Sequence, residues 1–267
     1  MNTNSKDMKR FLISFFVMAL AATAMAQPSG GDSALLGIFN HVGIGIGAGT
    51  DGITAEVAAP IGGYVQIRAG YGFAKFDTQF RLARIAVPTE PGDGYENSPK
   101  VDVPLLICPG INTGRILVNA YPSPNSVFYF SAGVFAGSRN YANVKAVGLP
   151  EAYNDAGYEI NGYIIKATDN TARAQFRQNT IKPYLGIGFG RPIGSRRCNV
   201  TFDLGVQYLG NAELWFWGNR KDGLGPDDWV KVERNDIDAD FVHYYDDVNK
   251  YARFWPTVSI RVWFKAI

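Results

Sequence analysis

The chain of 267 residues is poor in the residue types and runs that identify several common protein classes. After the N-terminal segment it has no run of 18 or more apolar residues, which excludes a further transmembrane helix. Its 26 Lys and Arg nearly balance its 24 Asp and Glu, so charge gives no argument for nucleic-acid binding. What it does have is abundant glycine and aromatic side chains at a modest overall hydropathy.

The N-terminus has the three parts of a secretory signal peptide. Basic residues precede an apolar segment at 11–22, which is too short to span a bilayer. A small-x-small tripeptide ends at Ala26, so we expect cleavage between Ala26 and Gln27. Because a Gln follows this site, no lipidated cysteine is expected. The sequence thus divides into a signal peptide, 1–26, and one mature domain, 27–267.

Apolar and polar residues alternate in eight segments of the mature chain. The clearest runs from Val65 to Phe73, where every second residue is apolar and those between are polar or glycine. A β-strand has a side-chain period of two, so such a segment presents one apolar and one polar face. The expected strands lie at about 38–48, 53–59, 64–76, 111–121, 126–137, 180–190, 199–209 and 255–266.

The connections between these segments alternate between short and long. The long ones are at about 78–110, 138–179 and 210–253, and only the first connection on that side is short. Outer-membrane barrels have short periplasmic turns and longer extracellular loops. The pattern predicts an all-β, antiparallel up-and-down transmembrane β-barrel of eight strands, with ten as the alternative. An even strand number places both termini in the periplasm.

Four stretches resemble a group of uncharacterised small outer-membrane β-barrel proteins of Bacteroides-type bacteria. They are 114–122, 182–190, 202–207 and 254–260. The resemblance implies a barrel similar to the OmpA membrane domain or OmpW, located in the outer membrane of a Gram-negative bacterium, and it implies no activity. One departure is that Phe264 is followed by three residues, whereas such barrels usually end on an aromatic residue.

Five charged residues are expected to face the barrel interior: Glu56, Arg68, Arg115, Asp203 and Arg261. The interior of an eight-stranded barrel is just wide enough to be filled by side chains. Because an unpaired buried charge is costly, we expect these residues to form lumen ion pairs that close the core. The alternative is a narrow channel for small solutes.

Aromatic residues lie at the outer ends of the last two expected strands. Trp215, Trp217 and Trp255 are interpreted as part of the aromatic girdle that flanks a membrane-spanning barrel. A sugar-binding platform is the alternative. The expected role is structural or interactional, with the outer loops as the binding face, since binding residues usually lie on loops held by a rigid scaffold.

The remaining candidates for chemistry are few. His41 and His243 fall at opposite ends of the expected barrel, so we expect no enzyme; a lipid-modifying enzyme is the second alternative. The acidic stretch at 236–247 lacks the glycine that a calcium loop needs at its sixth position, so neither metal nor cofactor is expected. Cys108 and Cys198 should also lie at opposite ends, as free thiols.

The expected partners follow from this location. They are outer-membrane lipid and lipopolysaccharide, the barrel-assembly machinery, and an extracellular ligand or envelope protein that contacts the loops. No nucleic-acid partner is expected.

Overall fold

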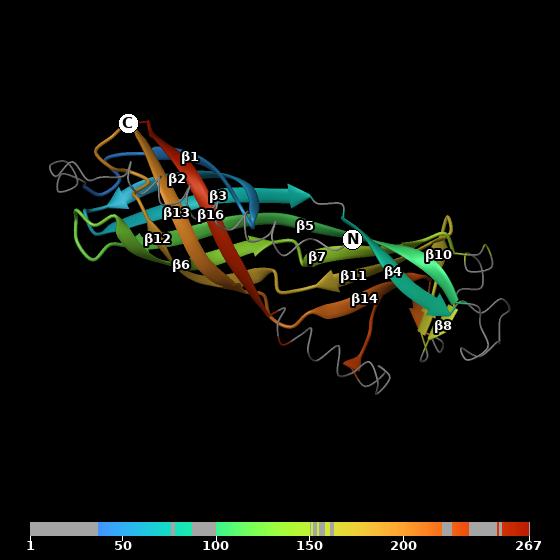
Figure 1. Cartoon of the computed structure of the whole chain (residues 1–267). Helices are drawn as coiled ribbons and strands as arrows, with labels where there is room; N and C mark the ends of the chain where they lie inside the picture. Colours follow the sequence, from blue (N-terminus) through green and yellow to red (C-terminus); the bar gives the residue numbers. More distant parts are fainter. Residues whose placement is uncertain are drawn as a thin grey trace.

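The computed structural model describes residues 37–75, 78–86, 100–149, 151, 154, 158–160, 163–220, 226–234, 250 and 253–266. The predicted signal peptide, its cleavage site at Ala26 and Gln27, His243 and the acidic stretch at 236–247 lie outside these residues. The described part consists of a closed barrel and a sheet that projects from one of its ends (Figure 1). No described helix is long and apolar enough to cross a membrane.

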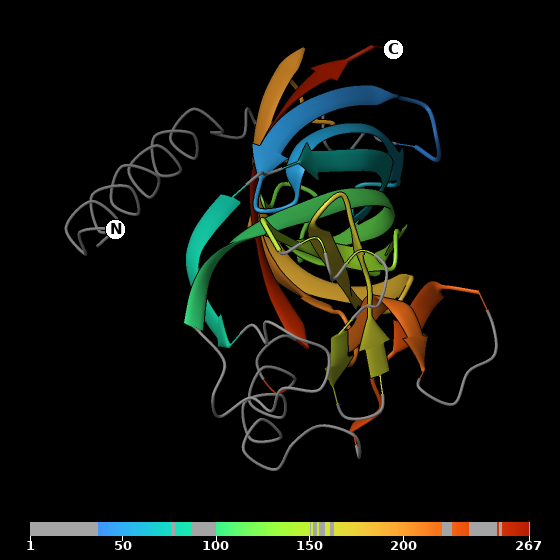
Figure 2. The same cartoon turned by 90° about the vertical axis from the view of Figure 1, so that its right-hand side faces the viewer.

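Eight antiparallel strands form the barrel. In spatial order they are β3 (Val65–Lys75), β2 (Gly52–Ile61), β1 (Gly43–Gly49), β16 (Phe254–Lys265), β13 (Cys198–Tyr208), β12 (Ile181–Phe189), β6 (Phe128–Gly137) and β5 (Lys100–Ala120). Pairing of β3 with the second half of β5 closes the ring. The predicted antiparallel barrel is therefore confirmed, with eight strands rather than ten (Figure 2).

The side chains of the barrel are arranged inside out relative to a water-soluble sheet protein. On β2, Ile53 and Val57 point outward with 63% and 50% of their surface exposed, while Thr54 and Glu56 are buried inside. Because successive strand residues point to opposite faces, the same alternation holds round the ring. The apolar face of each barrel strand is thus the outer face.

The three long connections also form strands. They contribute β4 (Thr78–Ala86), β7 (Asn140–Val147), β8 (Tyr158–Ile160), β9 (Tyr163–Ile165), β10 (Ala167–Thr168), β11 (Thr171–Arg177), β14 (Glu213–Arg220) and β15 (Asp228–Lys231). We call these strands, with the first half of β5, the extension. Strands β8 and β9 pair with each other outside the barrel.

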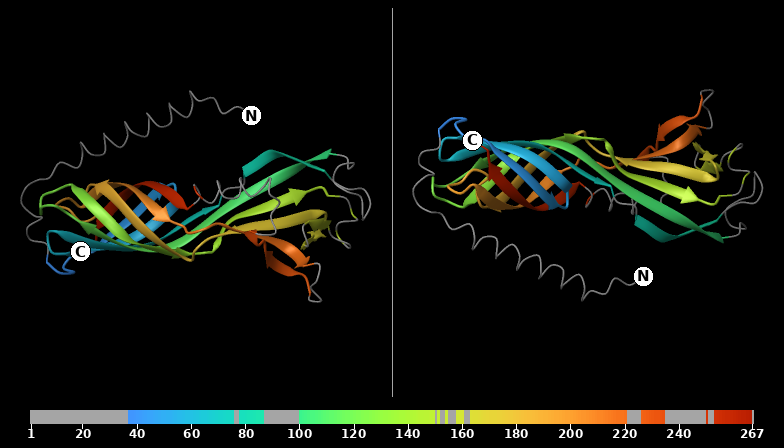
Figure 3. Two further views of the ribbon diagram at one scale, coloured as in Figure 1. Left: turned by 90° about the horizontal axis from the view of Figure 1, so that it is seen from below. Right: turned by 90° about the horizontal axis from the view of Figure 1, so that it is seen from above.

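One strand belongs to both parts of the molecule. The second half of β5 pairs with β3 and β6 in the barrel, while its first half pairs with β4 and β7 in the extension. The extension therefore continues from one rim of the barrel, as both views in Figure 3 show. The short turns after β2, β5 and β12 lie together at the other rim.

Candidate functional site

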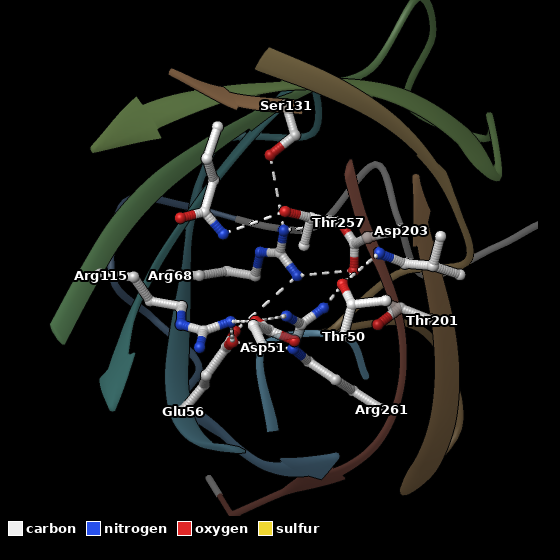
Figure 4. Close-up of polar contacts among 12 residues, drawn as sticks. Thr50, Asp51, Glu56, Arg68, Arg115, Ser131, Thr201, Asp203, Thr257 and Arg261 are labelled. Carbon is white, nitrogen blue, oxygen red and sulfur yellow. Dashed lines mark hydrogen bonds and ion pairs between the residues drawn. The ribbon is translucent and has the colours of Figure 1, made fainter. Parts of the chain in front are cut away.

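The barrel interior contains a cluster of ion pairs built from opposite walls. Arg68 on β3 donates to both carboxylate oxygens of Asp203 on β13, at 2.8 and 3.1 Å. Arg261 on β16 donates to Oε1 of Glu56 at 2.7 Å and also to Asp203. Figure 4 shows these side chains converging on the barrel axis. Four of the five charged residues predicted to face the lumen therefore lie in direct contact.

The fifth, Arg115, connects the cluster to a residue that the sequence did not suggest. Its Nη1 lies 3.5 Å from Oε1 of Glu56 and donates to Asp51. Asp51 belongs to the turn between β1 and β2, and its side chain folds back into the barrel, 3.8 Å from Arg261. An Asp-Gly pair, as at 51 and 52, is a signal for a hairpin turn, but that signal carries no information on where the Asp side chain points.

The cluster is balanced in charge and shielded from solvent. Arg68, Arg115 and Arg261 face Asp51, Glu56 and Asp203, and none of the six is more than 3% exposed. The Tyr129 hydroxyl donates to Oδ1 of Asp203 at 2.8 Å, which adds a neutral partner. Mutual pairing offsets part of the cost of burying these charges. Five buried polar atoms of the cluster, on Asp51, Glu56, Arg68 and Arg115, have no hydrogen-bond partner among the described residues. The cluster therefore fills the middle of the barrel instead of lining an open path.

The rim that carries the short turns is closed by the turn after β12. Ile193 is fully buried and packs with Ala58 and Trp263. Gln66 holds the Ile193 backbone, donating to its carbonyl at 2.8 Å and accepting from its N–H at 3.3 Å. Trp263 fits because β1 has a glycine beside it: a Cβ at Gly45 would lie 2.6 Å from the Trp263 ring.

Arg191, in the same turn as Ile193, connects the three short turns by hydrogen bonds. Its guanidinium donates to the carbonyls of Ser126 at 2.8 Å, Ser123 at 3.1 Å and Gly63 at 3.1 and 3.2 Å. It also lies 3.9 Å from the centroid of the Tyr121 ring. No sequence pattern predicted this role, since Arg191 lies in a short turn with no periodicity.

The opposite end of the cluster is closed by the turn between β1 and β2. The Thr50 backbone N–H donates to the carbonyl of Val258 at 2.9 Å, and its hydroxyl accepts from the Val258 N–H at 3.1 Å. This attachment to β16 fixes Asp51 over the cluster. The interior is thus occupied at two successive levels, by Ile193 and by the ion-pair cluster, in which Asp51 lies nearest the extension.

The outer surface of the barrel carries two rings of exposed aromatic side chains. Near the short turns these are Tyr64, Phe130, Phe189 and Phe264; near the extension they are Tyr71, Phe73, Tyr208 and Phe254. Exposed aliphatic side chains occupy the surface between the rings, among them Ile46, Val57, Ile116, Val134, Leu185 and Leu204. This is the layered surface of a barrel that spans a bilayer.

The three predicted girdle tryptophans are not found together. Trp255 lies on β16 at the rim that faces the extension, paired with Gln207. Trp215 and Trp217 instead lie on β14, within the extension, where Trp217 pairs with Trp229 of β15. The sequence located these residues near the outer ends of the barrel strands but could not show that β14 continues beyond the rim.

The two cysteines lie apart, as expected, whereas the expected separation of His41 from His243 stays a prediction because His243 lies outside the described residues. His41 precedes β1 at the short-turn rim, and its Nδ1 lies 2.6 Å from the Asn40 carbonyl oxygen. Cys198 begins β13 at the same rim and is a free, exposed thiol, whereas Cys108 lies in the extension half of β5, paired with Asn143. The described part of the chain contains no group of three or more His, Cys, Asp or Glu that could hold a metal ion.

Comparison with known proteins gives structural likeness only. No family model and no curated protein matches the chain. Acinetobacter baumannii CarO2 is 17% identical, with a TM-score of 0.46 over 84% of this chain and 98% of CarO2. CarO of the same organism is also 17% identical, with a TM-score of 0.44 over 86% of this chain and 98% of CarO. A major outer membrane protein from Thermus thermophilus is 17% identical, with a TM-score of 0.38 over 84% of this chain and 98% of that protein. Likeness at this level carries no inference about activity.

Proposed function

We propose that the chain is an integral outer-membrane protein of a Gram-negative bacterium, in which a closed barrel anchors the extension for contacts outside the cell. The observation that carries this proposal is the aliphatic band between two aromatic rings on the barrel. A surface of this kind is costly in water and favourable in a bilayer with aromatic side chains at its interfaces.

The dimensions of the band fit a bilayer. On β16 the two aromatic rings are represented by Phe254 and Phe264, ten residues apart. At a rise of about 3.3 Å per residue this separation is about 33 Å along the strand. A strand tilt of about 40° reduces it to about 25 Å along the membrane normal, the height of the apolar band in outer-membrane barrels.

The filled interior favours an anchoring role over the alternative of a small-solute channel. A conducting path would have to pass Ile193 and then the ion-pair cluster that includes Asp51, and both are held by hydrogen bonds from other strands. A lipid-modifying enzyme is the second alternative, and it has less support: in the described part of the chain, His41 bonds only to the neighbouring Asn40 carbonyl.

The proposed orientation places the extension outside the cell and the short turns in the periplasm, as in other barrels of this type. Outer-membrane lipid and lipopolysaccharide would then surround the barrel, and the barrel-assembly machinery would insert it. The resemblance to Bacteroides-type barrel proteins is consistent with this proposal. The extension, rather than the lumen, would contact an extracellular ligand or envelope protein.

A charged substitution on the aliphatic band tests the membrane location. Leu185, 71% exposed and central in β12, would be changed to Arg, and the exposed Thr168 of the extension would be changed to Arg as a control. In a lipid-facing position the charge costs about 2–4 kcal/mol of folding free energy, whereas at a water-exposed site it costs little.

The readout is urea-induced unfolding from lipid vesicles, followed by the difference in gel migration between boiled and unboiled samples. We expect Leu185→Arg to unfold at clearly lower urea and Thr168→Arg to match the wild type. Equal stability of the two variants, or recovery of the mature protein as a soluble periplasmic species, would overturn the proposal.

A further inference from the structure

One face of the extension combines basic and aromatic side chains. On β11, Arg173, Gln175 and Arg177 share this face, because alternate residues of a strand point the same way. The antiparallel register pairs Arg177 with Glu213 and Gln175 with Trp215 of β14. Continuing along β14, Trp217 points to the same side as Trp215. We call this surface the basic–aromatic face.

The tryptophans on this face are held in a defined arrangement. Trp217 on β14 and Trp229 on β15 pair in the sheet, and their rings meet edge to face at 5.8 Å between centroids. The Arg177 guanidinium lies 4.1 Å from the Trp215 ring centroid and 5.5 Å from that of Trp229. Its Nε and Nη2 donate to Oε1 of Gln175, which fixes the plane of the guanidinium.

The charges on this face are strongly one-sided. Around the tryptophans lie five cations, Lys145, Arg173, Arg177, Lys231 and Arg139, and two carboxylates, those of Glu213 and Asp228. Glu213 is already shared between Arg139 at 3.3 Å and Lys231 at 3.1 Å. Arg173 and Lys145 are paired neighbours on β11 and β7, both exposed, and neither is within 4.0 Å of a carboxylate of the described residues.

Neither the fold nor the barrel requires this combination. A solvent-exposed sheet face needs polar residues, but it does not need three tryptophans beside an excess of cations. Indole rings stack on the apolar C–H faces of sugar rings, and guanidinium and ammonium groups pair with carboxylate, sulfate or phosphate groups. A ligand that offers both kinds of group along its length matches the face in shape and charge.

We propose that the basic–aromatic face binds anionic polysaccharide chains. The sugar rings would stack on Trp217 and Trp229, and the acidic substituents would pair with Arg173 and Lys145. From Arg177, next to the barrel rim, to Arg173 the face extends about 13 Å along β11, away from the barrel, at about 3.3 Å per residue. That direction favours an extended chain over the headgroup of a lipid in the surrounding membrane. The inference rests on the proposed function in requiring the extension to face outside the cell.

The test uses the folded protein in detergent. Folding of the barrel is shown first, by different gel migration of boiled and unboiled samples. A failure to bind can then be distinguished from a failure of the membrane proposal. Titration with polygalacturonate, followed by tryptophan fluorescence and calorimetry, should give saturable binding that weakens with added salt. Uncharged dextran of similar length should bind far more weakly. Vesicles of phosphatidylglycerol test the alternative that the face binds the headgroups of anionic lipids.

Two variants test the residues, and a third is the matched control. The double change Arg173→Gln with Lys145→Gln should weaken polygalacturonate binding about tenfold through loss of two exposed ion pairs. Trp217→Ala should weaken it about fivefold through loss of ring stacking. Arg197→Gln, an exposed cation at the opposite rim, should have no effect.

Three results would overturn the inference. They are absence of saturable polygalacturonate binding, equal binding of dextran, and preferential binding of phosphatidylglycerol vesicles. Equal loss of binding in Arg197→Gln and in the double variant would also overturn it, because it would show that net charge rather than this face is responsible.

Discussion

Arg68 and Asp203 form a two-pronged ion pair across the barrel, although 135 residues separate them in the chain. Three strands lie between β3 and β13 in each direction round the ring, so the pair joins diametrically opposite walls. It therefore links the two walls through the interior of the barrel. Arg261 and Tyr129 donate hydrogen bonds to the same carboxylate from two further strands. The stability of the barrel should depend on this carboxylate more than on any exposed charge.

Changing Asp203 to Asn should destabilise the barrel strongly. The substitution keeps the side-chain shape but leaves Arg68 and Arg261 without their shared negative charge, and breaking one partner of a buried ion pair costs about 3–5 kcal/mol. Urea-induced unfolding in lipid vesicles would measure the loss. Asp228→Asn, at an exposed position of β15, is the control and should change the unfolding free energy by less than about 0.5 kcal/mol.

A double-mutant cycle checks that the pair, rather than the carboxylate alone, is responsible. Arg68→Met combined with Asp203→Leu should cost clearly less than the sum of the two single changes, because neither charge then remains unpaired. Additive losses would show that the two residues do not stabilise each other.

Glycines that face large lumen side chains should tolerate no substitution. A Cβ at Gly188 would lie 2.3 Å from the ring of Tyr129, a side chain that is fully buried. Gly188→Val should therefore force Tyr129 off Asp203 and cost about 1–3 kcal/mol or more through overpacking. Gly62→Ala, at a short turn where nothing lies within 4 Å of the new Cβ, is a useful comparison for the packing effect. Its positive φ adds backbone strain alone.

The junction between barrel and extension should respond to acid at a low pH. Burial tends to raise the pKa of Glu213, but hydrogen bonds from Lys231 and Trp215 and the charges of Lys231 and Arg139 outweigh it, so the pKa is lowered. A lowered pKa means that Glu213 contributes stability above its ordinary value of 4.5, and that this contribution is lost as the pH falls through the folded pKa.

Tryptophan fluorescence against pH would follow this loss. We expect the wild type to show a transition below about pH 4.5 that is missing in Glu213→Gln, since the variant has no carboxylate to protonate. The same transition in both proteins, or a wild-type transition well above pH 5, would assign the acid response to another group.

Thiol labelling of whole cells would test the orientation. Cys198 is exposed at the short-turn rim, which is proposed to face the periplasm. With Cys108 changed to Ser, a membrane-impermeant maleimide should leave Cys198 unlabelled in intact cells and label it after outer-membrane permeabilisation. Thr168→Cys, in the extension, should be labelled in intact cells. The opposite pattern would reverse the topology.

The barrel strands could be predicted from sequence to within a few residues at most ends. A membrane barrel places lipid on one side and packed polar side chains on the other, so the two faces of β2 and β13 differ sharply in composition. The charged residues on the inner faces follow from the same alternation, which is why Glu56, Arg68, Arg115, Asp203 and Arg261 were identified together.

The remaining features depend on contacts between distant segments. Asp51 and Arg191 lie in turns, where side-chain direction is set by tertiary structure and not by a period of two. The long connections were expected as loops. Their strands instead pair with neighbours such as β7 with β11, whose registers no local pattern specifies. Trp215 and Trp217 of β14 were therefore placed on the barrel rim instead of on the basic–aromatic face.

Conductance across a planar bilayer tests the central claim most directly. That claim is that the extension binds ligands outside the cell while the lumen of the barrel stays closed. The purified, heat-modifiable protein should insert without producing current steps at neutral pH. Stable channel openings, altered when Arg68 or Arg261 is neutralised, would contradict this claim and establish the lumen as a pathway.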